Sequence, residues 1–266
     1  MNPTDASLAR LWLFLSLLAA LSLIERLQPG PNPAQRRLQR WPVHLGLLAL
    51  DTAVARLLLP AGAVGVALWA ESTGFGLFNA AFARGFDAAL PWLQWLLCLL
   101  AMDLAIYWQH RWLHRFPGLW RLHRVHHTDT TLDASSALRF HPLEILLSLL
   151  YKMALVAALG IDPIIVLVFE ALLSSFALIT HANIALPPRL DRALRWLLVT
   201  PAMHWIHHST RCEEQQRNYG FHLSAWDRLF GSYAAASQDA PQTFGVAGVD
   251  QARATRIGAL LREPFR

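Results

Sequence analysis

Five long apolar stretches constrain the fold of this chain more than any other feature of its sequence. A helix needs about 20 apolar residues to cross a bilayer, and a backbone inside lipid must satisfy its own hydrogen bonds. The stretches cover roughly residues 8–24, 43–70, 89–108, 143–159 and 163–180. We therefore expect an all-α, polytopic membrane helical bundle with about four to five spans.

Two of these stretches leave alternatives open. The first can be a signal peptide, although residues 1–9 carry Asp5, contain no basic residue and show no clear A-x-A cleavage site. The second is interrupted by Asp51, Arg56 and Pro60. It can form one kinked span, or a span followed by a re-entrant piece.

The composition agrees with a membrane protein. Hydrophobic residues make up 55% of the chain and charged residues 15%, which is more apolar than a typical soluble domain. The net charge of +5 comes from scattered arginines, several of which flank apolar stretches, so we expect no nucleic-acid partner. Two cysteines, Cys98 and Cys212, exclude a disulfide framework and a four-cysteine metal site.

The arginines also predict an orientation. They follow the first, third and fifth stretches at Arg36, Arg37, Arg40, Arg111, Arg115, Arg121, Arg124, Arg189, Arg192 and Arg195. The connection between the second and third stretches has only Arg84, with Asp87 nearby. The positive-inside rule places the arginine-rich segments in the cytosol. We expect a membrane-embedded domain over residues 1–233 and a cytosolic C-terminal tail over residues 234–266.

Eight of the twelve histidines fall into three tight clusters within or beside these arginine-rich segments. The patterns are H-x-x-x-H, H-x-x-H-H and again H-x-x-H-H, formed by His110, His114, His123, His126, His127, His204, His207 and His208. Residues three and four apart share a helix face, so each cluster can aim its rings at one point. Neutral imidazole is the commonest protein ligand for metals, and two ions is the simplest count.

Helix breakers set the local structure around the clusters. The sequence F-P-G at 116–118 ends one helix, and the second cluster then occupies a short helix over about 119–127. Thr200 can cap a helix whose first turn contains Pro201, which carries the third cluster. The sequence G-I-D-P at 160–163 predicts a tight helical hairpin between the last two apolar stretches. Together these signals predict a cytosolic helical cap that carries the histidines.

One helical stripe joins the first cluster to the membrane interior. Asp103, Tyr107, His110 and His114 follow i, i+4, i+7 and i+11. A carboxylate at membrane depth is costly and points to a function. Asp103 can accept an imidazole N–H and fix the tautomer of a ligand histidine, or it can pair with an arginine of another helix.

Four histidines lie outside the clusters. His181 ends the fifth apolar stretch on the cytosolic side, where a further metal ligand can reach the clusters. His141 precedes Pro142 and is expected to have a structural role, or to support a ligand. His44 and His222 are expected to be ordinary residues. Several other chemistries are absent from the sequence, since it contains no H-E-x-x-H, E-x-x-H, G-x-S-x-G or Walker A pattern.

The three histidine patterns among membrane spans resemble the sterol desaturase / fatty acid hydroxylase superfamily. The flanking segments resemble it as well: A-L-R-F-H-P-L-E at 137–144, N-Y-G at 218–220 and W-D-R-L-F-G-S-Y at 226–233. The similarity covers about residues 103–233. The first two apolar stretches resemble the family only in being long and apolar, and not in a residue pattern.

The resemblance implies a membrane-embedded di-iron oxygenase. Such an enzyme hydroxylates or desaturates a C–H bond of a lipid, such as a sterol or a fatty acyl chain, with O₂ and two external electrons. The eight clustered histidines carry over as iron ligands, and His181 matches the family's extra histidine before the third cluster. Asn183 stands near a position where some members have a further ligand. Tyr107, His141 and Asp227 join Asp103 as candidates for supporting the ligands.

The resemblance also implies a separate electron donor, ferredoxin-like or cytochrome b5-like with its reductase, because no such domain is fused here. Zinc can replace iron in a purified form. The arginine-, alanine- and leucine-rich composition favours a bacterial inner membrane. Tyr107, Trp108, Trp120 and Trp205 can line a substrate pocket or anchor the chain at the membrane interface.

Two other classes of protein remain open from the residues alone. A membrane cytochrome would hold haem through one or two histidines, which leaves most of the clustered histidines without a role. A zinc-binding membrane hydrolase or transporter would use the same imidazole ligands. Transport is disfavoured because the clusters lie near one surface and not at the bilayer midplane.

Overall fold

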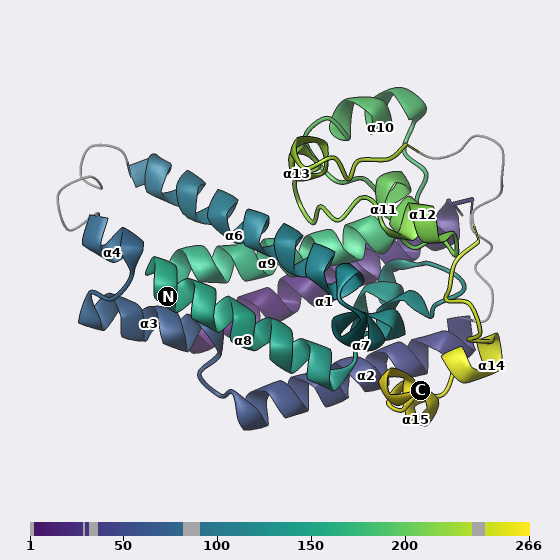
Figure 1. The fold of residues 1–266 in the computed structure, drawn as a ribbon, viewed down its shortest axis with the longest axis horizontal. Helices are drawn as coiled ribbons and strands as arrows, with labels where there is room; N and C mark the ends of the chain where they lie inside the picture. Colours follow the sequence, from purple (N-terminus) through teal and green to yellow (C-terminus); the bar gives the residue numbers. More distant parts are fainter. Residues whose placement is uncertain (1–2, 29, 32–36, 82–90, 236–242) are drawn as a thin grey trace.

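The structure is a computed structural model that describes residues 3–28, 30–31, 37–81, 91–235 and 243–266 (Figure 1). Its helices in chain order are α1 (Pro3–Leu27), α2 (Arg37–Leu58), α3 (Gly62–Thr73), α4 (Leu77–Ala81), α6 (Pro91–Arg115), α7 (Pro117–His127), η2 (Ala134–Leu138), α8 (Pro142–Leu159), α9 (Pro163–His181), α10 (Pro188–Leu194), α11 (Pro201–His207), α12 (Cys212–Gln215), α13 (Ala225–Leu229), α14 (Gln251–Ala254), α15 (Ile257–Leu260) and η3 (Glu263–Phe265). Within the described ranges, β-type pairing is limited to two isolated bridges. The predicted all-α class is confirmed.

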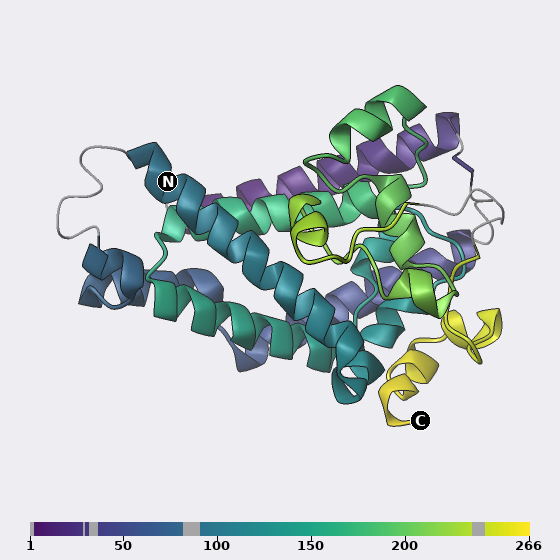
Figure 2. The same ribbon diagram turned by 45° about the horizontal axis from the view of Figure 1, so that its top comes forward.

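The long helices α1, α2, α6, α8 and α9 form the body of the molecule (Figures 1 and 2). Four helical segments are long and apolar enough to cross a membrane: Leu8–Leu27, Arg37–Ala80, Pro142–Leu159 and Pro163–His181. The 25-residue α6 lies beside them and carries the first histidine cluster. This agrees with the expected bundle of four to five spans.

The second apolar stretch is one broken segment. Helix α2 ends at Leu58, and α3 begins at Gly62, whose φ of 57° is in the left-handed region. Helix α2 starts beside the cap, whereas Gly76, after α3, touches the backbone of Gly160 at the far end of α8. The chain therefore continues across the bundle after the break, as a kinked span does.

The hairpin between α8 and α9 forms as expected. Gly160 ends α8 with a φ of 65°, and the Asp162 carboxylate accepts the backbone N–H of Ile164 at 2.7 Å. Large apolar side chains such as Trp12, Leu57 and Trp92 remain on the outside, with exposed fractions of 66%, 80% and 61%. An outer surface of this kind suits lipid as the surrounding solvent.

The cap lies at the end of the bundle where α6 and α9 end, and it contains α7, η2 and α10–α13 (Figure 1). Residues 243–266 pack against it. The backbone carbonyl of Ala254 accepts a hydrogen bond from Arg139 at 2.7 Å, and Glu263 pairs with Arg124 at 2.7 Å. The orientation expected from charge rests partly on Arg36, Arg84 and Asp87, which lie outside the described residues.

A buried ionic network joins the cap to α2. Arg40 is 1% exposed, and its guanidinium contacts Asp129 at 2.6 Å and Asp133 at 2.8 Å. Both carboxylates belong to the loop that follows α7. The side chain of Glu25 in α1 accepts the backbone N–H groups of Ala134 and Asn183, each at 2.8 Å. These contacts hold the loop after the second histidine cluster against α1 and α2.

Replacing Arg40 should therefore destabilise the fold. An Arg40→Gln variant leaves the buried Asp129 without its paired arginine and Asp133 with only Arg37 at 3.8 Å, and breaking a buried ion pair typically costs about 3–5 kcal/mol. The measurement is the free energy of unfolding in detergent, taken on metal-free protein. Arg211→Gln is the matched control, because that arginine is 46% exposed and its 3.5 Å contact with Glu214 should contribute less than about 1 kcal/mol. Equal losses in the two variants would contradict this account.

Candidate metal centre

The first two histidine clusters meet at a helical corner. Helix α6 ends at Arg115, Phe116 takes an extended conformation, and Pro117 starts α7. Proline suits the first turn of a helix but cannot continue the preceding one. The corner turns His123, His126 and His127 of α7 back toward the histidines of α6, as the sequence predicts.

The third cluster arrives from the other side of the cap. The Thr200 hydroxyl accepts the Met203 backbone N–H at 3.4 Å, and Pro201 begins α11, so the predicted cap is observed. His204 and His207 lie in α11, and His208 is its C-terminal capping residue. His181 is the last residue of α9.

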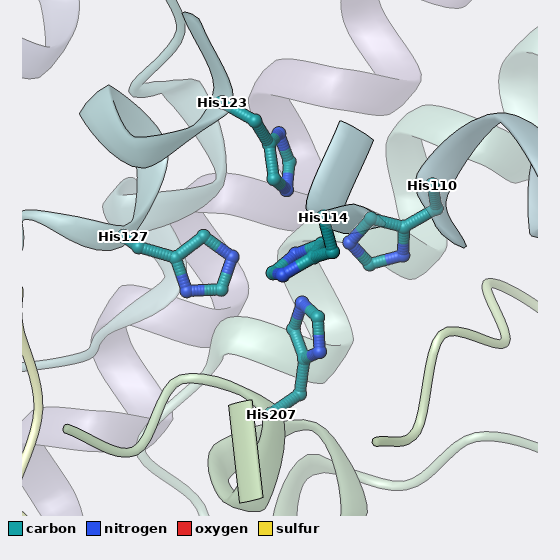
Figure 3. A group of neighbouring side chains, drawn as sticks. All are labelled: His110, His114, His123, His127 and His207. Carbon is teal, nitrogen blue, oxygen red and sulfur yellow. The ribbon is translucent and has the colours of Figure 1, made fainter. Parts of the chain in front are cut away.

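All nine histidines proposed as ligands converge, and they divide into two groups. The first group comprises His110, His114, His123, His127 and His207, whose rings surround one point (Figure 3). The second comprises His126, His181, His204 and His208. Within each group the candidate ligand atoms lie within 4.8 Å of one another, and all nine residues are buried. The neighbours His126 and His127 belong to different groups.

The second group has the spacing of a coordination sphere. The Nε2 atom of His181 lies 3.0 Å from that of His126, 3.1 Å from that of His208 and 3.2 Å from that of His204. Four nitrogens about 2.0–2.1 Å from a shared ion would lie about 3.3–3.4 Å apart. The observed spacing is close to this value.

Hydrogen bonds on the outer side of the rings fix where the lone pairs point. His181 donates its Nδ1 proton to the Ala177 carbonyl at 2.7 Å, and His126 donates to the Arg139 carbonyl at 3.2 Å. Their Nε2 atoms therefore hold lone pairs that face each other. Buried lone pairs without a partner cost about 1–3 kcal/mol each, so the arrangement fits a cation between the rings.

The first group is built in the same way. Nδ1 of His110 donates to the Tyr219 carbonyl at 2.9 Å, and Nδ1 of His207 donates to the Arg217 carbonyl at 2.8 Å. Nε2 of His207 and both ring nitrogens of His114 and His127 have no hydrogen-bond partner among the described residues. Such orphaned imidazole nitrogens fit a second metal ion.

Burial keeps the rings in the form that binds metal. It lowers the pKa of His207 to about 3, and it holds the pKa values of His127, His204 and His208 well below the usual value. Neighbouring histidines lower the same pKa values further. The rings are therefore neutral at pH 7, and neutral imidazole is the ligand form.

Glu144 is a site residue that the sequence analysis missed. Its Oε1 atom accepts the Nδ1 proton of His123 at 2.6 Å, which directs Nε2 of His123 into the first group. A carboxylate in this position fixes the tautomer and raises the basicity of a ligand imidazole. The sequence contains one signal that could have identified Glu144, because it is an acidic residue in the first turn of the mostly apolar helix α8.

The expectation for Asp103 needs correction. Among the described residues, its hydrogen bonds join it to neither a clustered histidine nor an arginine. It accepts the Nδ1 proton of His222 at 2.6 Å and the indole N–H of Trp226 at 2.9 Å. Asp103 and His110 lie on one face of α6, as the helical stripe predicts. The hydrogen bonds of Asp103, however, go to a separate segment of the cap that contains His222 and Trp226. His222 is therefore not the ordinary residue expected.

Tyr107 and Asp227 support the site at one remove. The Tyr107 hydroxyl bonds to Ser232 at 2.8 Å, and Asp227 accepts the backbone N–H of Tyr219 at 2.8 Å. Asp227 also accepts the backbone N–H of Gly220 at 2.8 Å, and this N–H belongs to the peptide group whose carbonyl orients His110. Asp227 was predicted to support a metal ligand, and its contact with His110 is indirect, through the backbone of Tyr219 and Gly220.

His141 and Asn183 have mainly architectural contacts. His141 caps α8 by accepting the Leu143 backbone N–H at 3.1 Å, and its Nε2 bonds to the Leu261 carbonyl at 3.2 Å. The backbone of Asn183 donates to Glu25. Among the four aromatic candidates, Trp120 packs against His114 with a centroid distance of 4.9 Å, whereas Trp205 lies in a separate cluster with Leu132.

The fold and the site define a membrane protein with a buried histidine centre at one end of a helical bundle. The sequence model of the fatty acid hydroxylase family matches residues 95–232, which contain all nine histidines. The chain therefore belongs to the fatty acid hydroxylase family. Its class is that of a membrane lipid oxygenase, an oxidoreductase, and neither the haem-carrier nor the zinc-protein alternative is favoured.

The names of similar proteins agree with this class. The chain is 28% identical to ornithine lipid hydroxylase OlsE of Rhizobium tropici over 88% of its own length and 70% of that protein. It is 32% identical to alkylglycerol monooxygenase of Danio rerio over 56% of its length, but it spans only 33% of that relative. It is 31% identical to a putative Δ(7)-sterol-C5(6)-desaturase of Arabidopsis thaliana over 54% of its length and 52% of that protein. No solved structure matches the chain.

The division into two groups predicts how metal is lost. Protein purified without chelators should hold about two ions per chain, because each group offers the three or more ligands that one ion needs. His127→Ala and His204→Ala remove ligands from different groups, so each variant should bind the ion of its own group more weakly and, after dialysis against a chelator that leaves two ions on the wild type, should hold about one ion. The measurement is elemental analysis against protein concentration. A folded variant that keeps two ions, or a folded double variant that still holds one, would contradict the assignment.

Proposed function

We propose that the chain is a di-iron oxygenase that inserts oxygen into, or removes two hydrogens from, an unactivated C–H bond of a membrane lipid. The observation that supports this most is the pair of histidine groups, whose inward nitrogens have no hydrogen-bond partners among the described residues other than one another. Iron ions bound there would supply the O₂ chemistry that no amino-acid side chain provides. The net change for hydroxylation is R–H, O₂, two electrons and two protons giving R–OH and water.

The chain's own residues perform three tasks in this proposal. The nine histidines, as neutral imidazoles, hold the ions, and His181 completes the second group. Glu144 and backbone carbonyls, such as that of Tyr219, keep the rings in one tautomer and orientation. Burial of every ligand keeps bulk water away, so that a reactive oxidant is not quenched before it meets the lipid.

The membrane setting supports a lipid substrate and a cytosolic reductant. The histidine groups lie at one end of the spans, where a lipid can enter from the bilayer while an electron carrier docks from the aqueous side. The arginines that accompany the histidine clusters favour the cytosolic side of a bacterial inner membrane. The donor would be a separate ferredoxin-like or cytochrome b5-like protein with its reductase. The proposal includes both hydroxylation and desaturation, because one similar protein is named a hydroxylase and another a putative desaturase.

The direct test is lipid analysis under labelled oxygen. Membranes that contain the chain should convert a lipid to a product that gains one ¹⁸O atom from ¹⁸O₂, or that lacks two hydrogens. His126→Ala and His207→Ala should each abolish the product, because each removes a ligand from a different group. Mass spectrometry of total lipids is the measurement. An unchanged product in both variants, with the proteins correctly inserted, would end the proposal.

Glu144 provides a subtler test. Glu144→Gln keeps the size of the side chain but removes the charge that orients His123, so metal affinity should fall by about 10–100-fold. Competition with a coloured chelator measures the affinity directly. Glu71→Gln is the matched control, because Glu71 is exposed on α3, away from the histidines, and should leave the affinity unchanged. The same affinity in both variants would show that the carboxylate has no influence on the metal.

A further inference from the structure

A histidine outside the two groups occupies an unusual position inside the bundle. His222 is 8% exposed, and its Nδ1 atom lies 2.6 Å from the Asp103 carboxylate. The same carboxylate also accepts the backbone N–H groups of His222 at 3.3 Å and Leu223 at 3.2 Å, together with the indole N–H of Trp226 at 2.9 Å. Four donors from one loop thus converge on a single side chain of α6.

This loop reaches well below the histidine groups, toward the middle of the bundle. Asp103 precedes His110 by seven residues on the same helix, which is about 10 Å along the helix axis. The His222 ring packs against Phe169 and Phe176 of α9, with centroids 5.4 Å and 4.9 Å away. Phe221 packs against the apolar core that contains Phe169. A loop of the cap is therefore inserted between α6 and α9.

The insertion is held rigidly. A Cβ atom on Gly220 would lie 2.7 Å from the Asp227 carboxylate and 2.8 Å from the Leu223 carbonyl, so only glycine fits at this turn. The carbonyl of His222 accepts the Val199 backbone N–H at 2.9 Å. The loop has a fixed path, and the orientation of the His222 ring follows from it.

One polar atom of this arrangement has no partner. Nε2 of His222 is buried, and no described residue forms a hydrogen bond with it. Because Nδ1 carries its proton toward Asp103, Nε2 of the neutral ring holds a lone pair. A buried acceptor without a donor costs about 1–3 kcal/mol, and such groups in native proteins usually have a ligand or water as partner.

We propose that Nε2 of His222 accepts a hydrogen bond from the hydroxyl group of an uncharged lipid. This inference rests on the proposed function, since it names the feature by which the oxygenase would select and align its substrate. The surrounding Phe169, Phe176 and Phe221 suit an apolar chain and offer no charge to an ionic headgroup. A hydroxyl provides the single donor that the lone pair requires.

The position of His222 then sets the site of oxidation. Asp103, which holds the His222 ring, lies about 10 Å from His110 along α6, so carbons some way along the chain from a hydroxyl bound at His222 would be presented to the metal centre. Selection of this kind is strong, because a site that bonds to a hydroxyl rejects an analogue that cannot donate. His222 is in this sense a substrate-binding residue, and Asp103 positions it.

The test is equilibrium binding to metal-free protein in detergent, which does not depend on catalysis. The probes are hexadecan-1-ol and hexadecyl methyl ether, which share a chain but differ in the donated hydrogen. The wild-type protein should bind the alcohol about tenfold more tightly than the ether, as one hydrogen bond to a buried acceptor allows. His222→Asn should remove the preference, because its amide N–H can still donate to Asp103 while nothing replaces Nε2.

Two controls keep the test decisive. Phe176→Leu removes an aromatic neighbour but leaves the acceptor, so it should weaken binding of both probes equally and retain the tenfold preference. His222→Phe should also abolish the preference, with thermal unfolding confirming that each variant is folded. Equal binding of the two probes to the wild type, or a preference that survives in His222→Asn, would overturn the inference. Loss of metal binding with the alcohol preference intact would instead refute the proposed function alone.

Discussion

The structure depends on the burial of imidazole lone pairs that point at one another. Nitrogens of four histidines lie about 3 Å apart in the second group, an arrangement that a shared cation would stabilise. On the outer side of five of the rings, Nδ1 donates a hydrogen bond to a backbone carbonyl or to a carboxylate. The acceptors come from four separate segments of the chain, at Ala177, Arg139, Glu144 and the pair Arg217 and Tyr219. The cap together with the adjoining ends of α8 and α9 brings those acceptors together.

Charges buried inside the protein hold the cap on the bundle. Arg40 of α2 holds the loop after the second histidine cluster through Asp129 and Asp133, and Glu25 of α1 holds the backbone on either side of it. On the opposite side, Asp103 of α6 holds the loop around His222. Each contact would be expensive if one partner were missing, so the spans and the histidine groups are fixed relative to each other. That rigidity would suit the proposed metal centre, whose nine candidate ligands come from four helices and their ends.

Much of the fold and site can be predicted because the signals are local. Apolar stretches of sufficient length specify spans, Pro117 and Gly160 end or turn helices, and Thr200 caps α11. Histidines three and four apart share a helix face whatever the rest of the chain does. The membership of His181 in the second group was also accessible, because its position at the end of an apolar stretch fixed its depth relative to the clusters.

The amino-acid sequence by itself determined that the long apolar helices form together with α7 and α11, which of these helices carry histidines, and that the histidines suit metal ions. Only the tertiary structure decided that the adjacent His126 and His127 face different groups, that Glu144 supports His123, and that His222 reaches Asp103 inside the bundle. The physical reason is distance along the chain. His222 and Asp103 are 119 residues apart, and no local periodicity specifies which of several buried polar groups will meet once the helices pack.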